Sequence, residues 1–287
     1  MLTIIADSGS TKTDWALIDT DSTVTYIHTQ GMNPVLMTQE EIERILCEEL
    51  LSNIDNRPSS VTLHFYGAGV RGEQIPKMLT AFTNAFHTSH PMLPTPQFTF
   101  SSDLLAAARA VCGRNEGIAC ILGTGANSCL YDGEKIVQNT PALGFILGDE
   151  GGGASLGKRF LNAIFKGELP AAMRDDYLST TGLTLADIIQ KVYREPMPNR
   201  FLASTSLYIG THLDNLELRR LIIENFRLFF RRNLLPYQRK DLPVGVVGSI
   251  GWHYLEQLQE AAKAEGFSLG TVIKSPIEGL IRFHLSA

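Results

Sequence analysis

The start of the chain alternates short apolar runs with polar turns. Residues 2–7 form an apolar run that ends in Asp7, residues 15–18 are apolar again, and residues 23–27 alternate apolar and polar side chains. Runs of this length, bounded by Ser, Gly, Thr and Asp, are typical of β-strands. The pattern predicts that the chain opens with an antiparallel meander.

Helical and strand-like patterns then alternate up to about residue 111. Apolar residues recur at helical spacing within residues 40–51, and residues 75–86 favour a helix with a proline near its start. Residues 61–66 and 98–100 favour strands. Ser102 and Asp103 precede an alanine-rich segment, residues 104–111, for which we predict a capped helix.

The same order begins again near residue 118. Residues 118–122 and 128–131 are apolar runs on either side of a glycine turn, and residues 135–137 follow a tight turn. Residues 155–235 are mostly helical in pattern, with breaks near 167–170, 182 and 196–198. Residues 244–247 favour a buried strand, 254–265 a helix and 277–285 a closing helix. This repeated order predicts two mixed-sheet α/β domains in tandem.

Composition excludes several classes of function. The 287 residues carry a net charge of −5, so there is no basic surplus for a nucleic-acid partner. No apolar run is long enough to span a bilayer, and the N-terminus lacks the pattern of a signal peptide. We therefore expect a cytoplasmic protein with neither a nucleic-acid nor a membrane partner.

The four cysteines are widely spaced and include no Cys-x-x-Cys pair. That spacing disfavours a zinc site. Cys120 and Cys129 fall within the apolar runs of the second half, where a reduced, buried thiol is the usual state.

The first candidate site is the turn Asp7-Ser8-Gly9-Ser10-Thr11-Lys12-Thr13. Glycine lets backbone N–H groups approach an anion, and the hydroxyls and Lys12 add donors, so Gly9, Ser10, Thr11 and Lys12 are candidate phosphate ligands. Asp7, at the strand end, is placed to hold a divalent cation directly or through water. The P-loop pattern is absent, and an ordinary polar hairpin turn is the alternative.

Two further glycine turns follow apolar runs. Leu122-Gly123-Thr124-Gly125-Ala126-Asn127-Ser128 repeats the chemistry of the first turn, which makes Gly123, Thr124 and Gly125 candidate phosphate ligands. In Val247-Gly248-Ser249-Ile250-Gly251, small residues would let a base or ribose lie against the backbone at Gly248 and Ser249. A capped strand-to-helix loop explains this last motif equally well.

In this order the three motifs resemble the phosphate-1, phosphate-2 and adenosine motifs of the sugar kinase, actin and heat-shock chaperone superfamily. Within it the chain is most similar to N-acetylglucosamine kinases and to the ATPases that include benzoyl-CoA reductase activators, through residues 123–127 and 148–152. The resemblance implies two ribonuclease-H-like (actin-like) domains with a cleft between them, residues 1–110 plus 276–287 and residues 111–275. It also implies ATP, Mg²⁺ and a small sugar as ligands, and a homodimer is an open expectation.

The resemblance also assigns roles to individual residues. Thr11 and Thr124 match phosphate ligands, Gly248 lies on the adenosine side, and Asp7 takes the place of the magnesium-associated acid. Asp103 falls where the kinases keep the aspartate that accepts the proton of the sugar hydroxyl. The sugar-contacting matches are Asn33 and Asp149, with Asn127 near the same pocket. Leu143 departs from the family, because the kinases can carry an aromatic residue there.

Two of these assignments have structural alternatives. A Ser-Asp pair at a helix start, such as Ser102-Asp103, is often only an N-cap. Asp149 and Glu150, followed by three glycines, are either a flexible acidic linker or carboxylates that bind sugar hydroxyls through a loop able to approach the ligand.

The leading hypothesis is an enzyme, an ATP-dependent kinase that phosphorylates a hydroxyl of N-acetylglucosamine or a related amino sugar or hexose. The first alternative is an ATPase activator of a reductase, which would need exposed cysteines for an iron–sulfur cluster. The second is a non-catalytic sugar or nucleotide sensor on the same fold.

Overall fold

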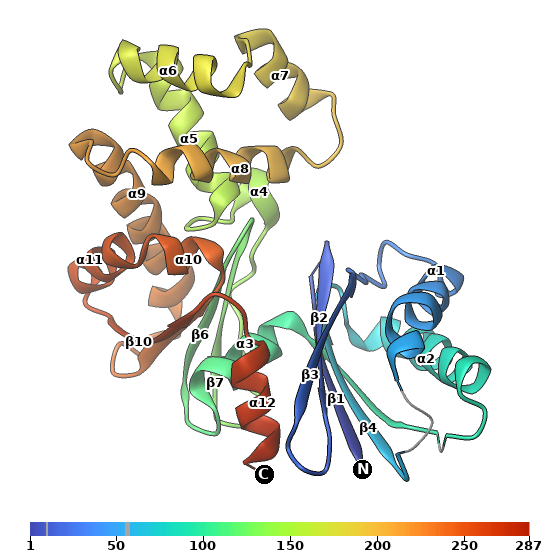
Figure 1. The fold of residues 1–287 in the computed structure, drawn as a ribbon. Helices are drawn as coiled ribbons and strands as arrows, with labels where there is room; N and C mark the ends of the chain where they lie inside the picture. The colour runs from blue at the N-terminus through green and yellow to red at the C-terminus, as the bar shows by residue number, and fades with distance from the viewer. Residues whose placement is uncertain (10, 55–57, 94, 287) are drawn as a thin grey trace. The chain divides into compact units, whose positions relative to one another are not determined.

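A computed structural model describes residues 1–9, 11–54, 58–93 and 95–286. The chain divides into two compact units, which we call unit 1 (Met1–Gly113 with Pro276–Ala287) and unit 2 (Arg114–Ser275). Figure 1 shows the elements of both. The closing helix, at the end of the chain, belongs to unit 1.

Unit 1 is built on a mixed sheet with the strand order β3-β2-β1-β4-β5. The first three strands form the predicted antiparallel meander, and β4 and β5 run parallel to β1. The strands are β1 Leu2–Ser8, β2 Lys12–Ile18, β3 Val24–Gln30, β4 Val61–Gly67 and β5 Gln97–Ser102.

The α-helices in the described residues of unit 1 are α1 Gln39–Ile45, α2 Ile75–Ser89, α3 Asp103–Cys112 and α12 Ile277–Leu285. A π-helical turn, Leu46–Leu50, continues α1. The apolar faces of α1 and α2 join the buried side of the sheet, where Trp15, Phe65 and Phe82 are fully buried. Gly279 of α12 lies so close to α3 that a Cβ there would be 2.5 Å from the carbonyl oxygen of Ala110.

Unit 2 has a second mixed sheet, with the strand order β10-β9-β6-β7-β8. Its antiparallel meander is β6–β7–β8, and β9 and β10 run parallel to β6. The strands are β6 Gly117–Leu122, β7 Ala126–Tyr131, β8 Ile136–Gln138, β9 Pro243–Val247 and β10 Ser268–Ile273. Each unit therefore places a meander beside two parallel strands in the same order, which confirms the predicted repeat of architecture.

Helices make up most of unit 2. They are α4 Gly144–Leu147, α5 Gly153–Lys166, α6 Ala171–Thr181, α7 Leu185–Tyr193, α8 Pro198–Gly210, α9 Leu216–Phe229, α10 Ser249–His253 and α11 Leu255–Glu265. The predicted breaks are real: Gly167 and Gly182 end α5 and α6 in the left-handed conformation that suits glycine. In Figure 1, α6 and α7 lie on the far side of α5 and α8 from the sheet.

Two features of unit 2 were not predicted from its sequence. The segment that forms β10 has no predicted strand, and one helix was expected to begin at Tyr254, where the structure has a break between α10 and α11. None of the described helices is long and apolar enough to cross a lipid bilayer.

Candidate functional site

The candidate residues of unit 1 gather where three neighbouring strands end. Ser8 of β1 pairs with Gly67 of β4, and Gly67 pairs with Ser102 of β5. We call Ser8, Gly67 and Ser102 the strand-end row. In the chain, Asp7 directly precedes Ser8, and Asp103 directly follows Ser102. The carboxyl ends of parallel strands are the usual ligand-binding edge of such sheets. The fold therefore brings two predicted site residues, about 95 positions apart in the chain, to one edge.

The carboxyl group of Asp7 is in an unfavourable place for a negative charge. Burial raises its pKa to about 7, and the negative charges of Asp14 and Asp103 add to the effect, against the opposing charge of Lys12. A buried carboxylate with like charges nearby fits a cation, because the cation offsets both the burial and the repulsion.

Asp7 would hold such a cation with few other protein ligands. Among the described residues, no group of three or more His, Cys, Asp and Glu side chains is arranged to hold a metal ion. Mg²⁺ keeps much of its water shell and is commonly bound by one or two carboxylates together with substrate phosphates, so Asp7 is a residue that could hold it.

Asp103 is the first residue of α3, and another residue caps that helix. The hydroxyl of Ser102 is the N-cap and accepts a hydrogen bond from the Leu105 backbone N–H at 3.2 Å. Burial raises the pKa of the Asp103 carboxyl, while the Leu104 backbone N–H, 2.8 Å from Oδ1, and the charge of Arg71 lower it. Because Ser102 fills the capping role, helix capping does not explain why an aspartate stands at 103.

The β1–β2 turn is held against the end of β3 by close backbone contacts. The Gly9 N–H donates to the Lys12 carbonyl at 3.0 Å, and the Gly31 N–H donates to the Thr11 carbonyl at 3.0 Å. A Cβ at Gly31 would lie 2.3 Å from the carbonyl oxygen of Gly9, so only glycine allows this approach. This role of Gly31 was not predicted from the sequence, and the predicted ligand Ser10 lies outside the described residues.

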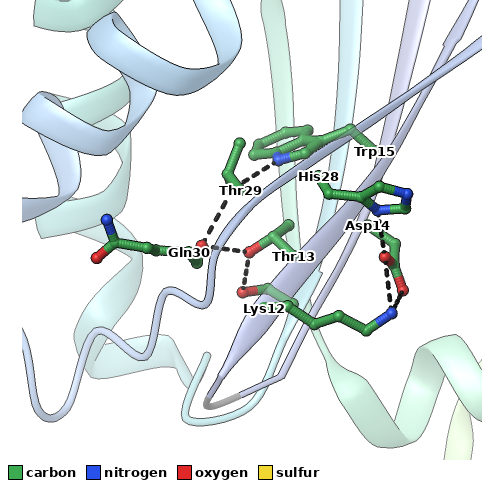
Figure 2. A network of polar contacts seen from close by, with 8 residues as sticks. Lys12, Thr13, Asp14, Trp15, His28, Thr29 and Gln30 are labelled. Atoms are coloured by element: carbon green, nitrogen blue, oxygen red, sulfur yellow. Dashed lines mark hydrogen bonds and ion pairs between the residues drawn. The ribbon is translucent and has the colours of Figure 1, made fainter.

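The side chain of Lys12 has a partner within unit 1. Its Nζ lies 3.0 Å from Oδ1 of Asp14, and His28 Nδ1 lies 2.7 Å from the same oxygen (Figure 2). The Asp14 side chain is only 10% exposed, whereas those of Lys12 and His28 are mostly exposed. This cluster beside Asp7 was missed, although Lys12 and Asp14 share a strand face and Asp14 pairs with His28 in register.

Asn33, predicted to contact the sugar, is held in a tight turn. Its Oδ1 accepts a hydrogen bond from the Val35 N–H at 3.0 Å. Gly69, which follows β4 with a φ of +79°, packs against this side chain so closely that a Cβ there would be 2.2 Å from Oδ1. Lys77 of α2 donates to the carbonyls of Pro34 and Met37, which anchors the rest of the loop.

In unit 2, the β6–β7 turn is bound to the start of α5. The N–H groups of Gly153 and Ala154 donate to the carbonyls of Gly123 and Thr124, both at 2.8 Å. The approach needs Gly152, because a Cβ there would be 2.6 Å from the carbonyl carbon of Gly125. The first turn of α5, which carries the positive end of the helix dipole, therefore lies next to the candidate phosphate turn.

The predicted adenosine motif meets the same turn. Gly248 has a φ of +126°, and a Cβ there would lie 2.3 Å from the carbonyl oxygen of Leu122. The parallel pairing of β9 with β6 brings the two strand ends together, because Ile121 pairs with Val247. Ser249, the first residue of α10, is exposed.

Asp149 also reaches this turn. Its Oδ1 accepts a hydrogen bond from the Ala126 N–H at 3.3 Å, and a Cβ at Gly125 would be 2.7 Å from Oδ2. Asp149 has a φ of 58°, a conformation that is costly for a residue other than glycine. Burial raises the pKa of its carboxyl group. Strain and burial together are typical of a side chain kept for binding rather than of a flexible linker.

The other two predicted sugar ligands are engaged with neighbours. Burial alone would raise the pKa of the Glu150 carboxyl, but hydrogen bonds from Arg232, at 2.7 Å, and Asn233 hold it below its usual value. The Oδ1 of Asn127 accepts a hydrogen bond from Asn139 Nδ2 at 3.0 Å. Both side chains are thus oriented by contacts within unit 2.

The cysteines do not form an exposed set. Cys120 and Cys129 are fully buried, as predicted, on the adjacent strands β6 and β7, and Cys47 and Cys112 are half-buried. An iron–sulfur cluster shared between subunits needs accessible thiolates, so these positions do not favour the activator hypothesis.

Comparisons with solved structures agree with this architecture. The chain is similar to a candidate N-acetylglucosamine kinase from Porphyromonas gingivalis, with 44% identity and a TM-score of 0.90 over 99% of both chains. A candidate N-acetylglucosamine kinase from Chromobacterium violaceum shares the fold at 17% identity, with a TM-score of 0.73 over 98% of both chains. A ROK family glucokinase from Streptomyces griseus, solved with glucose and AMPPNP, shares it at 15% identity, with a TM-score of 0.51 over 100% of this chain and 99% of that one.

No protein-family model and no curated protein sequence matches the chain. The fold is that of the two-lobed actin-like ATPases, within the superfamily of sugar kinases, actin and heat-shock chaperones. At 44% identity over nearly its whole length, the chain belongs to the N-acetylglucosamine kinase family represented by the P. gingivalis protein.

Proposed function

We propose that the chain is a kinase that transfers the γ-phosphoryl group of ATP to a hydroxyl of N-acetylglucosamine or a related amino sugar. The observation that carries the proposal is the position of Asp103, a half-buried residue directly after the strand-end row and within the electrostatic reach of Asp7. A carboxylate that orients the attacking hydroxyl, close to a cation-binding acid, is what phosphoryl transfer requires of a protein.

In the proposed reaction, Asp103 accepts a hydrogen bond from the sugar hydroxyl and takes its proton as the oxygen attacks. A bond forms between that oxygen and the γ-phosphorus, and the bond from the γ-phosphorus to the bridging oxygen breaks, so that ADP leaves with the electron pair. The burial that raises the pKa of Asp103 makes this carboxylate a stronger base, and the charge of Arg71 opposes that rise.

Asp7 is the proposed magnesium-associated residue, directly or through water. When bound with the nucleotide, Mg²⁺ would neutralise phosphate charge during transfer. The protein's own part is to keep the Asp7 carboxyl at the strand end, buried and beside Asp14 and Asp103, where a cation offsets the repulsion.

The remaining assignments follow the glycine turns. Each unit would contribute its own set of groups. We also propose that the protein acts in the cytoplasm, because ATP and Mg²⁺ are available there. The proposed nucleotide ligands are Gly9, Ser10, Thr11, Lys12, Gly123, Thr124, Gly125, Gly248 and Ser249, and the proposed sugar ligands besides Asp103 are Asn33, Asn127, Asp149 and Glu150.

A panel of sugars tests the proposal. Purified protein with ATP and Mg²⁺ is given N-acetylglucosamine, glucosamine, N-acetylmannosamine or glucose, and both ADP and sugar phosphate are measured. We expect sugar-dependent ADP release matched by an equal amount of sugar phosphate, greatest with an acetylated amino sugar. Sugar binding without any phosphorylated product would instead identify a sensor and contradict the proposal.

A further inference from the structure

The loop between β4 and α2 connects the two candidate sugar-binding groups of unit 1. It begins at Gly67, the middle member of the strand-end row, and the Ala68 N–H donates to the carbonyl of Ser8 at 2.9 Å. Gly69 packs against the Asn33 amide, and Arg71 comes two residues later. The loop therefore begins beside Ser102, the residue before Asp103, and passes the Asn33 amide before it reaches Arg71.

Arg71 stands four residues beyond Gly67, the residue that pairs with Ser102, and it is not bonded to Asp103. Its positive charge acts on the Asp103 carboxyl and lowers the pKa of that group. Yet the exposed Arg71 side chain forms neither a hydrogen bond nor an ion pair with any residue in the described part of the chain, unlike Arg232 or Arg239. A guanidinium has five N–H donors and no acceptor. All five are available to a ligand.

Asn33 adds donors on the other side of Gly69. Its Oδ1 is identified by the hydrogen bond it accepts from Val35, which makes the remaining atom Nδ2. This amide nitrogen donates to no residue in the described ranges. On the side of the sheet edge where Asp103 is a hydrogen-bond acceptor, unit 1 thus has two groups that can only donate: Nδ2 of Asn33 and the guanidinium of Arg71.

We propose that Arg71 determines substrate specificity by binding an acceptor-only oxygen, a carboxylate or an amide carbonyl, on a substituent of the sugar. A sugar hydroxyl can donate as well as accept, so it satisfies Asp103 as well as Arg71. A carboxylate or amide oxygen can only accept, and it is matched by a guanidinium and repelled by Asp103. Arg71 therefore favours acylated or acidic sugars over sugars that carry only hydroxyl or amino groups. The inference rests on the proposed function, with Asp103 as the base.

The test compares Arg71→Met with the wild type by calorimetric titration of three sugars in the absence of nucleotide. They are N-acetylglucosamine, its lactyl-ether derivative that carries a carboxylate, and glucosamine, whose ammonium group has no acceptor. We expect binding of at least one of the first two to weaken by roughly 10- to 100-fold, on the magnitude of a hydrogen bond to a charged group. Binding of glucosamine should change little. A larger loss for the lactyl derivative identifies the carboxylate as the ligand, and an equal loss for both acetylated sugars identifies the amide carbonyl.

Two further variants separate specificity from damage to the fold. Arg71→Lys keeps the charge but loses the planar fork, so it should recover only part of the affinity. Arg282→Met removes another exposed arginine of unit 1, in α12, and should bind all three sugars like the wild type.

An equal loss for all three sugars, no loss for any, or a wild type that binds none of them would overturn the inference. Because the titration needs no turnover, a wild type that binds sugars but transfers no phosphate would overturn the proposed function and leave the Arg71 comparison intact.

Discussion

Gly152→Ala should weaken the attachment of α5 to the β6–β7 turn. Gly152 has a φ of −77° and a ψ of 166°, which any residue can adopt, so the added methyl group causes no backbone strain. It would, however, lie 2.6 Å from the carbonyl carbon of Gly125, and neither backbone can yield by rotating a side chain. The turn and the helix must therefore separate.

The expected loss of local stability follows from the hydrogen bonds that this separation breaks. The hydrogen bonds from Gly153 and Ala154 to the turn, both 2.8 Å long, would stretch or be lost. At about 0.5–1.5 kcal/mol for each bond, the variant should lose about 1–3 kcal/mol of local stability. Gly123→Ala is a matched control in the same turn, because a Cβ there would meet no atom within 4 Å.

Amide hydrogen exchange at Gly153 and Ala154 measures this loss of local stability directly. Gly152→Ala should speed exchange at both amides by roughly 5- to 150-fold, whereas Gly123→Ala should leave exchange near the wild-type rate. Wild-type protection in Gly152→Ala, or equal acceleration in the control, would refute the reasoning.

Three other predictions concern Gly69, the carboxyl group of Asp7, and the buried cysteines. Gly69→Ala forces a methyl group onto Asn33 and strains a backbone φ of +79°. In steady-state kinetics it should raise the KM for sugar more than the KM for ATP, and equal changes in the two constants would contradict this prediction. Without divalent cations, the Asp7 carboxyl of the folded protein, with its pKa of about 7, still holds a proton at pH values above about 3.8, where the unfolded chain has released it. The free energy of unfolding should therefore decrease as the pH rises from about 3.8 to about 7, and it should decrease more in the wild type than in Asp7→Asn. Urea unfolding across that range would show parallel curves if the carboxyl titrates normally. Cys120 and Cys129 should react with a thiol reagent only after unfolding, and rapid labelling of the native protein would show that they are accessible.

The sequence predicted the parts of the fold that are determined locally. The meander β1–β3 follows from apolar runs separated by turn residues, and the ends of α5 and α6 follow from Gly167 and Gly182. In contrast, β10 is an edge strand without a fully buried residue, and it contains Gly270, so its own residues give little strand signal. It exists because it pairs with β9, a long-range contact that no window of sequence reveals.

The same distinction applies to the candidate site. The glycine turns could be found because their composition is unusual. The roles of Gly31, Gly69 and Gly152 could not, because each allows an approach to a segment that is distant in the chain. Arg71 was missed for the same reason, since only the pairing of β4 with β5 brings its loop beside Asp103.

The most direct test of the central claim is the turnover of Asp103→Asn, measured together with its affinity for ATP. The substitution keeps the size of the side chain and its place at the start of α3, but it removes the base. We expect kcat for sugar phosphorylation to fall by about 10²–10⁴, on the magnitudes of general-base catalysis, with ATP binding nearly unchanged. Phosphorylation of the sugar at the wild-type rate by this variant would contradict the assignment of Asp103 and the mechanism built on it.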